Sequence, residues 1–159
     1  MILGRRVVKP RKQGIKRKGG IKRLPRKRRK KTPLTIAKEK LEEVQKELVI
    51  KLYGRDCYTC PKKNLIGMNC QLGHVPWPRS ELSVRCIFTT DFTRMQCFRC
   101  NINCGGNGAK ALRRMEWEGI DLVALEAQNL ATKGKPTPLQ WFYDKKTEYE
   151  LKLLALVKV

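Results

Sequence analysis

The chain has 159 residues, of which 36 are Lys or Arg and 14 are Asp or Glu, and its formal net charge is +22. This length suits a single domain, and a hydrophobic fraction of 41% is enough for a core. No apolar stretch approaches a membrane span, and the first residues lack the apolar segment of a signal peptide. We therefore expect a soluble, cytoplasmic protein with no membrane partner. Its charge makes nucleic acid the first partner to consider.

The positive charge is concentrated in the first 32 residues. They contain 16 Lys and Arg and no acidic residue, which leaves a net charge of +6 for residues 33–159. A segment this poor in apolar residues is expected to be disordered until it binds phosphate. A solvated tail or a localisation signal is the alternative, but a nucleic-acid-binding tail suits the rest of the chain better. The densest basic run is Arg26, Lys27, Arg28, Arg29, Lys30 and Lys31.

A helix is predicted to follow the basic tail and to open a single domain over 33–159. Thr35 is placed to cap its start, and Gly54 marks its end. Apolar residues recur at spacings of three and four, so they share one helix face that we expect to contact the core. They are Ala37, Leu41, Val44, Leu48 and Leu52.

The middle of the chain has a different character. All seven cysteines and the only histidine lie between residues 55 and 108. Short strands are predicted at 69–75 and 84–88, and helices at 109–118 and 120–130. The predicted fold class is therefore α+β, with a small zinc-stabilised core at 55–118 and helices on either side.

The last helix is predicted to begin at a capping box, Thr137-Pro138-Leu139-Gln140. Its apolar stripe is expected to close the core or to form an interface. The residues of this stripe are Leu139, Phe142, Tyr149, Leu153 and Leu156.

Two Cys-x-x-Cys pairs, Cys57 with Cys60 and Cys97 with Cys100, predict a structural zinc site. A short loop holds each pair in chelating geometry, and four thiolates complete a tetrahedral Zn²⁺. A redox role is the alternative, which two such pairs in a basic chain disfavour. The remaining cysteines are Cys70, Cys86 and Cys104. The first two are expected to be small buried apolar residues, and the third could replace a zinc ligand.

His74 ends the first predicted strand, between the two cysteine pairs. The order of elements resembles the ββα-metal arrangement of HNH endonucleases. It consists of a cysteine pair, a strand ending in His, a second strand, and a second cysteine pair that opens a helix. The chain also resembles the NinG (Rap) family of bacteriophage recombination nucleases, which is HNH-like. This resemblance covers roughly residues 31–156. The matching segments are Cys57-Tyr58-Thr59-Cys60, Gln71-Leu72-Gly73-His74, Gln96-Cys97-Phe98-Arg99-Cys100-Asn101 and Gly106-Asn107.

The resemblance implies a divalent-cation-dependent DNA endonuclease that cuts recombination intermediates such as Holliday junctions and D-loops. It implies that His74 is the general base and that Asn101 is a catalytic residue that binds Mg²⁺ or Mn²⁺. It also makes the two cysteine pairs the structural zinc ligands. Asn107 matches a Gly-Asn motif of the family, with capping of the next helix as an alternative role.

Two positions depart from the HNH pattern. The position where the pattern has a central Asn is occupied by Phe92, and the adjacent Asp91 is a candidate cation ligand in its place. Many HNH nucleases also have an Asp beside the histidine, whereas Gln71 and Gly73 are the neighbours of His74 here. Because a carboxylate is the better ligand for a hard cation, the sequence predicts a weak cation site.

Aromatic and basic residues near the motif are candidate DNA contacts. Trp77 lies between two prolines, where it could insert at a junction or anchor a loop. The basic candidates in the domain are Arg79, Arg85, Arg94, Arg99 and Lys110.

Three functions fit these observations to different degrees. A structure-selective endonuclease explains His74 and Asn101 together. A non-catalytic zinc protein that binds DNA or RNA shares the tail and the cysteines, and Phe92 favours it. A ribosome-associated protein accounts for the tail alone. Paired cuts in a junction would favour a homodimer, and a phage-encoded protein would act in the host cytoplasm.

Overall fold

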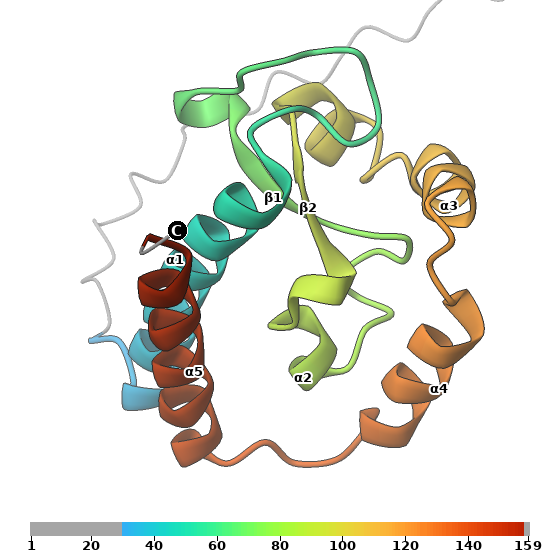
Figure 1. Cartoon of the computed structure of the whole chain (residues 1–159). Coiled ribbons are helices and arrows are strands. Elements are labelled where there is room, and N and C mark those ends of the chain that lie inside the picture. Colours follow the sequence, from blue (N-terminus) through green and yellow to red (C-terminus); the bar gives the residue numbers. More distant parts are fainter. Residues whose placement is uncertain (1–29, 158–159) are drawn as a thin grey trace, which may run out of the picture. The chain divides into compact units, whose positions relative to one another are not determined.

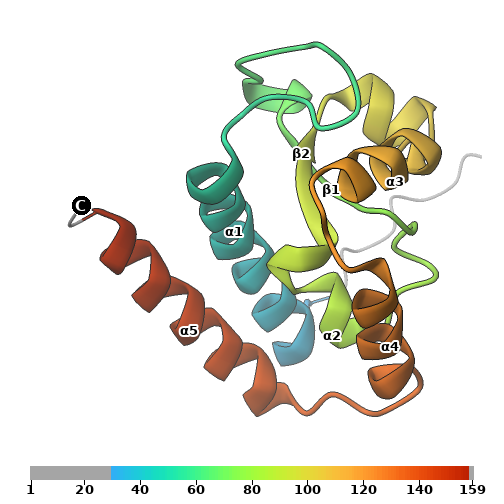
Figure 2. The same ribbon diagram turned by 45° about the vertical axis from the view of Figure 1, so that its right-hand side comes forward.

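The computed structural model describes residues 30–157. The tail predicted to be disordered, residues 1–32, lies outside the described residues except for residues 30–32. The described residues confirm the α+β class: helices flank a small two-stranded sheet (Figures 1 and 2). None of the helices in this part of the chain combines the length and the apolar composition of a membrane span. The α-helices are α1 (Pro33–Tyr53), α2 (Val84–Ile87), α3 (Gly108–Trp117), α4 (Leu122–Thr132) and α5 (Leu139–Val157). The strands are β1 (Gln71–His74) and β2 (Thr93–Gln96), and the short turns of helix are η1 (Gly67–Asn69), η2 (Thr90–Phe92) and η3 (Arg99–Asn103).

Helix α1 begins earlier than predicted. Its cap is Thr32, whose Oγ1 accepts a hydrogen bond from the backbone N–H of Thr35 at 3.2 Å. The prediction that Thr35 caps the helix was therefore wrong. Pro33 explains the difference, because the first helical position needs no N–H donor and the proline ring presets the helical φ. The helix ends at Gly54 as predicted, with a φ of 79° that favours glycine.

The long helices α1 and α5 pack side by side (Figures 1 and 2). The core cluster between them contains Ala37, Leu41, Leu48, Phe88, Phe142 and Tyr149. The Tyr149 hydroxyl donates a 2.6 Å hydrogen bond to the buried carbonyl oxygen of Phe88. The ends of both predicted stripes are exposed: Leu52 is 44% exposed and Leu156 is 42% exposed.

The sheet is antiparallel, with Gln71 opposite Gln96 and His74 opposite Thr93. Strand β1 lies within the predicted strand 69–75. The prediction of a strand at 84–88 was wrong, because this segment forms the short helix α2. Ser83 caps that helix by accepting a 3.2 Å hydrogen bond from the Cys86 N–H. The actual second strand, β2, is polar in sequence but fully buried. Its polar side chains are hydrogen-bonded inside the protein, so it lacks the apolar alternation by which a strand is recognised.

The C-terminal helices differ only slightly from the predicted ranges, except at the start of α5. The Thr137 Oγ1 atom is buried and has no hydrogen-bond partner, so the predicted capping box does not form. A second core cluster joins α2, α3 and α4 to the sheet region. It contains Tyr58, Val75, Leu82, Cys86, Phe92, Ala111, Met115 and Leu125.

Candidate functional site

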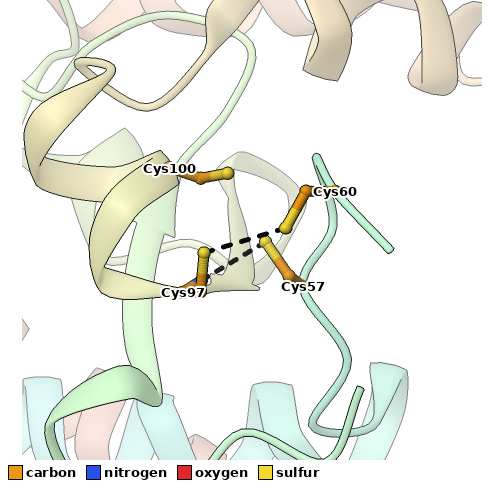
Figure 3. A group of neighbouring side chains, drawn as sticks. All are labelled: Cys57, Cys60, Cys97 and Cys100. Carbon is orange, nitrogen blue, oxygen red and sulfur yellow. Dashed lines mark hydrogen bonds between the residues drawn. The ribbon is translucent and has the colours of Figure 1, made fainter. Parts of the chain in front are cut away.

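The four cysteines predicted to bind zinc lie together (Figure 3). Cys57 and Cys60 follow α1, whereas Cys97 and Cys100 follow β2. Their Sγ atoms all lie within 4.8 Å of one another, and those of Cys60 and Cys97 are 3.8 Å apart. A tetrahedron with Zn–S bonds of about 2.3 Å has S–S edges of about 3.8 Å. The donor set and its spacing therefore fit a structural metal ion such as zinc.

The charge balance of this cluster also favours a cation. Burial raises the pKa of Cys57, but hydrogen bonds from the backbone of Cys97 and Thr59 lower it to about 6. The Cys97 N–H lies 3.3 Å from the Cys57 Sγ atom. Burial and the neighbouring sulfurs raise the pKa of Cys60 to about 12. Four adjacent thiols cannot all ionise alone, and a bound dication supplies the compensating charge.

The other cysteines are not part of the cluster. Cys70 and Cys86 are buried at 6% and 1% exposure and belong to core clusters, as predicted. Cys104 is exposed and lies outside the group of four, so the suggestion that it replaces a zinc ligand is not supported.

A cavity of about 670 Å³ brings His74 and Asn101 together. The lining comes from α1, η1, β1, the loop after β1, and the segment 98–106. The lining residues are Glu42, Lys46, Gly67, Met68, Cys70, Gln71, Leu72, His74, Pro78, Arg79, Phe98, Asn101, Ile102, Gly105 and Gly106. The two residues that the sequence paired as base and cation ligand therefore share one cavity.

His74 is neutral at physiological pH. Burial, and secondly the positive charge of Arg79, lower the pKa of His74 to about 4 from an ordinary value of 6.5. A hydrogen bond to the Ile87 backbone and the negative charge of Glu42 oppose this shift. The Nε2 atom is buried and has no hydrogen-bond partner. A neutral imidazole has one unprotonated nitrogen, and no group of the described protein donates a hydrogen bond to the enclosed Nε2 atom.

Asn101 connects the cysteine cluster to β1. It follows Cys100 in η3, and its backbone N–H donates to the Cys97 carbonyl oxygen at 2.9 Å. Its side-chain Nδ2 donates to the Oε1 atom of Gln71, also at 2.9 Å. The carbonyl oxygen of the side-chain amide is left for another partner. A metal ion in the cluster would therefore also fix the position of Asn101.

Gln96, in β2, holds Gly106 of the cavity lining in place, a role that the sequence did not reveal. It is fully buried, and its Nε2 donates to the carbonyl oxygen of Gly106 at 2.7 Å. A Cβ atom at Gly73 would lie 2.1 Å from the Gln96 Oε1 atom. Glycine therefore precedes His74 because the Gln96 side chain occupies the space of a Cβ. The sequence signal was a polar residue directly before the second cysteine pair.

The two residues at the departures from the HNH pattern lie elsewhere. Phe92 is fully buried, and its ring centroid is 6.2 Å from that of Trp77. Asp91 is exposed in η2 and is not among the residues that line the cavity. Its negative charge raises the pKa of Tyr149 in α5, which places it near that helix. The prediction that Asp91 replaces the missing cation ligand is therefore corrected.

Some of the candidate DNA contacts are accessible, and others pack against the protein itself. Arg79 lines the cavity, and Arg99 and Lys110 are exposed. Lys30 and Lys31 are exposed as well, whereas Arg26, Lys27, Arg28 and Arg29 lie outside the described residues. Trp77 packs against the core cluster around Phe92, which favours the loop-anchoring alternative. Arg85 is half-buried, with its guanidinium 6.0 Å from the ring centroid of Trp141.

Arg94 was wrongly predicted to contact DNA. It is only 5% exposed, and its guanidinium lies 3.9 Å from the ring centroid of Tyr53 and 5.4 Å from that of Tyr58. It also donates to the backbone carbonyl oxygens of Thr90 and Thr93 at 3.0 and 2.8 Å. A buried, stacked arginine with these partners supports the fold.

Comparison with known proteins adds no relative: no protein-family model, no curated protein and no solved structure matches the chain.

Proposed function

We propose that this chain is a zinc-stabilised, divalent-cation-dependent endonuclease of the HNH type, with a ββα-metal core. One observation carries the proposal: neutral His74, at the end of β1, lines the same cavity as Asn101, which follows the second cysteine pair. The antiparallel order of β1 and β2, followed by a helical segment, supports the same arrangement. The resemblance to NinG nucleases adds the expectation of branched DNA as substrate.

The chemistry assigned to His74 is proton removal from a water molecule. A general base must be unprotonated at working pH and must have a free lone pair. The lowered pKa of His74 and the unpartnered Nε2 atom meet both conditions. A bound Mg²⁺ or Mn²⁺ would stabilise negative charge on the phosphate. The free amide oxygen of Asn101 suits such a cation, which prefers oxygen donors.

The remaining charges suit a polyanionic substrate. Lys46 and Arg79 line the cavity and can bind the phosphates on either side of the reacting one. The 16 basic residues of the tail and the exposed Arg99 and Lys110 would add salt-dependent affinity without reading sequence. DNA is therefore the proposed partner, and homodimer formation would account for paired cuts in a junction.

Cleavage of a panel of DNA substrates tests this function. Zinc-loaded full-length protein is incubated with a four-way junction, a D-loop and a linear duplex of the same sequence, with Mg²⁺, Mn²⁺ or EDTA. We expect cutting of the branched substrates that requires a cation. Cutting of the linear duplex at the same rate would refute the preference for branched DNA.

The second candidate is a DNA- or RNA-binding protein on the same scaffold without catalysis. The buried, apolar Phe92 favours it, because that position supplies no polar group to the cavity. Tight binding of the four-way junction with no cutting in any cation would select this candidate over the nuclease.

A further inference from the structure

Glu42 brings a carboxylate to the cavity from a distant part of the sequence. It lies in α1, and of the described residues that line the cavity it alone is acidic. The segment around His74 contains no acidic neighbour, so the sequence predicted a weak cation site. The fold places a negative charge in that cavity together with His74 and Asn101.

Glu42 is close enough to His74 for the two to interact electrostatically. The negative charge of Glu42 raises the pKa of His74, whereas Arg79 lowers it. The charges of Glu42 and Arg79 therefore both act on the neutral His74 ring within the cavity. Lys46, one helical turn after Glu42, is the other charged residue of the lining.

The present partner of Glu42 is held weakly. The two guanidinium nitrogens of Arg79 lie 3.3 Å from the two carboxylate oxygens. The side chains of Arg79 and Glu42 are 49% and 43% exposed. An ion pair of this length with both side chains exposed is screened by water and contributes little to stability. The pair can open when a stronger partner for either residue arrives.

We propose that Glu42 is the carboxylate ligand of the divalent cation in this cavity, beside the side-chain oxygen of Asn101, and that Arg79 leaves Glu42 to bind a DNA phosphate. This inference rests on the proposed nuclease function. A carboxylate supplies the full negative charge that a hard cation needs and that the amides of Asn101 and Gln71 lack. Arg79 and the cation compete for Glu42, so a phosphate that attracts Arg79 favours cation binding.

The competition between Arg79 and the cation predicts opposite effects of two substitutions. Glu42→Gln removes the charge and should weaken Mn²⁺ binding at least tenfold. Arg79→Gln frees the carboxylate and should tighten Mn²⁺ binding several-fold in the absence of DNA. Glu43→Gln is the matched control, because Glu43 is adjacent in α1, exposed, and does not line the cavity.

Mn²⁺ binding to the zinc-loaded full-length protein measures these effects directly. The free ion is quantified by electron paramagnetic resonance, without DNA and without any cleavage step. Zinc content and the melting temperature of each variant confirm that the fold is intact. An unchanged affinity in Glu42→Gln, an equal loss in Glu43→Gln, or no Mn²⁺ binding by the wild-type protein at millimolar concentration would overturn the inference.

The failure of this inference and that of the nuclease function give different results. If the wild-type protein cuts junctions while Glu42→Gln binds Mn²⁺ as tightly as wild type, the nuclease stands and Glu42 is not the ligand. If Mn²⁺ binding depends on Glu42 and no DNA is cut, the cation site stands and the nuclease fails.

Discussion

Substitution of Gly73 by alanine is predicted to lower the free energy of unfolding through a steric clash with Gln96. An added Cβ would lie 2.1 Å from the Oε1 atom, 2.6 Å from Cδ and 2.9 Å from Cγ of that side chain. Ordinary contacts are about 3.5–4.0 Å. The strand cannot slide away easily, because Gly73 is held opposite Arg94 in the sheet. The Gln96 side chain must therefore move.

The cost of that movement has two parts. Extra volume in a packed interior costs about 1–3 kcal/mol. Loss of the 2.7 Å hydrogen bond to Gly106 leaves a buried polar group without a partner, which costs about 1–3 kcal/mol. We expect a total near 3 kcal/mol, because some relaxation is shared between the two terms. For a domain of this size, this corresponds to a melting temperature lower by roughly 10 °C.

A double-mutant cycle tests the cause of the destabilisation. Urea unfolding of the zinc-loaded protein is followed by circular dichroism for Gly73→Ala, Gln96→Ala and the double variant. In the Gln96→Ala background, Gly73→Ala should cost less than about 1 kcal/mol, because the obstructing side chain is absent. An equal cost in both backgrounds, or no cost in the wild-type background, would refute the steric explanation.

Three further predictions concern the metal cluster, the histidine and the core. Cys97→Ser should abolish zinc binding and cooperative melting, whereas Cys104→Ser, at an exposed position, should melt like wild type. Native mass spectrometry measures the bound zinc, and calorimetry measures the melting. Normal melting of Cys97→Ser would contradict the zinc role. Because the pKa of His74 is about 4 when folded and 6.5 in its ordinary state, the unfolded chain takes up the proton first as pH falls. The stability from neutral His74 is therefore fully present above pH 6.5 and lost towards pH 4, about 3 kcal/mol in all. Urea unfolding at pH 5 and 7 should show a smaller pH dependence for His74→Gln than for wild type, and equal dependence would oppose the assignment. Tyr149→Phe should cost about 1–2 kcal/mol, because the buried carbonyl oxygen of Phe88 loses its 2.6 Å donor; urea unfolding showing no loss would argue against that bond.

The features that depend on local spacing were predictable from the sequence. A short loop brings the two thiols of each Cys-x-x-Cys pair together, so the four cysteines of the candidate metal site could be named before the fold was known. His74 at a strand end and Asn101 after the second cysteine pair follow from the same local pattern. The end of α1 at Gly54 was predicted because the end of a helix depends only on the residues close to it in sequence.

The features that depend on tertiary contacts were not predictable. Arg94 resembles a surface residue in sequence, yet two tyrosine rings and two carbonyl oxygens hold it inside. Strand β2 was missed because its buried polar side chains find partners only in the folded protein. Glu42 is one of several acidic residues in α1, and only the packing of that helix places it in the cavity with His74.

The assignment of His74 as the general base is tested by single-turnover cleavage of a four-way junction by wild-type protein and His74→Ala, with binding measured in parallel. We expect His74→Ala to bind the junction with wild-type affinity and to cut it at least about 100-fold more slowly, since general base catalysis contributes about 10²–10⁴-fold. Cleavage by His74→Ala at the wild-type rate would contradict the assignment of the base. Binding without cleavage by the wild-type protein would contradict the nuclease.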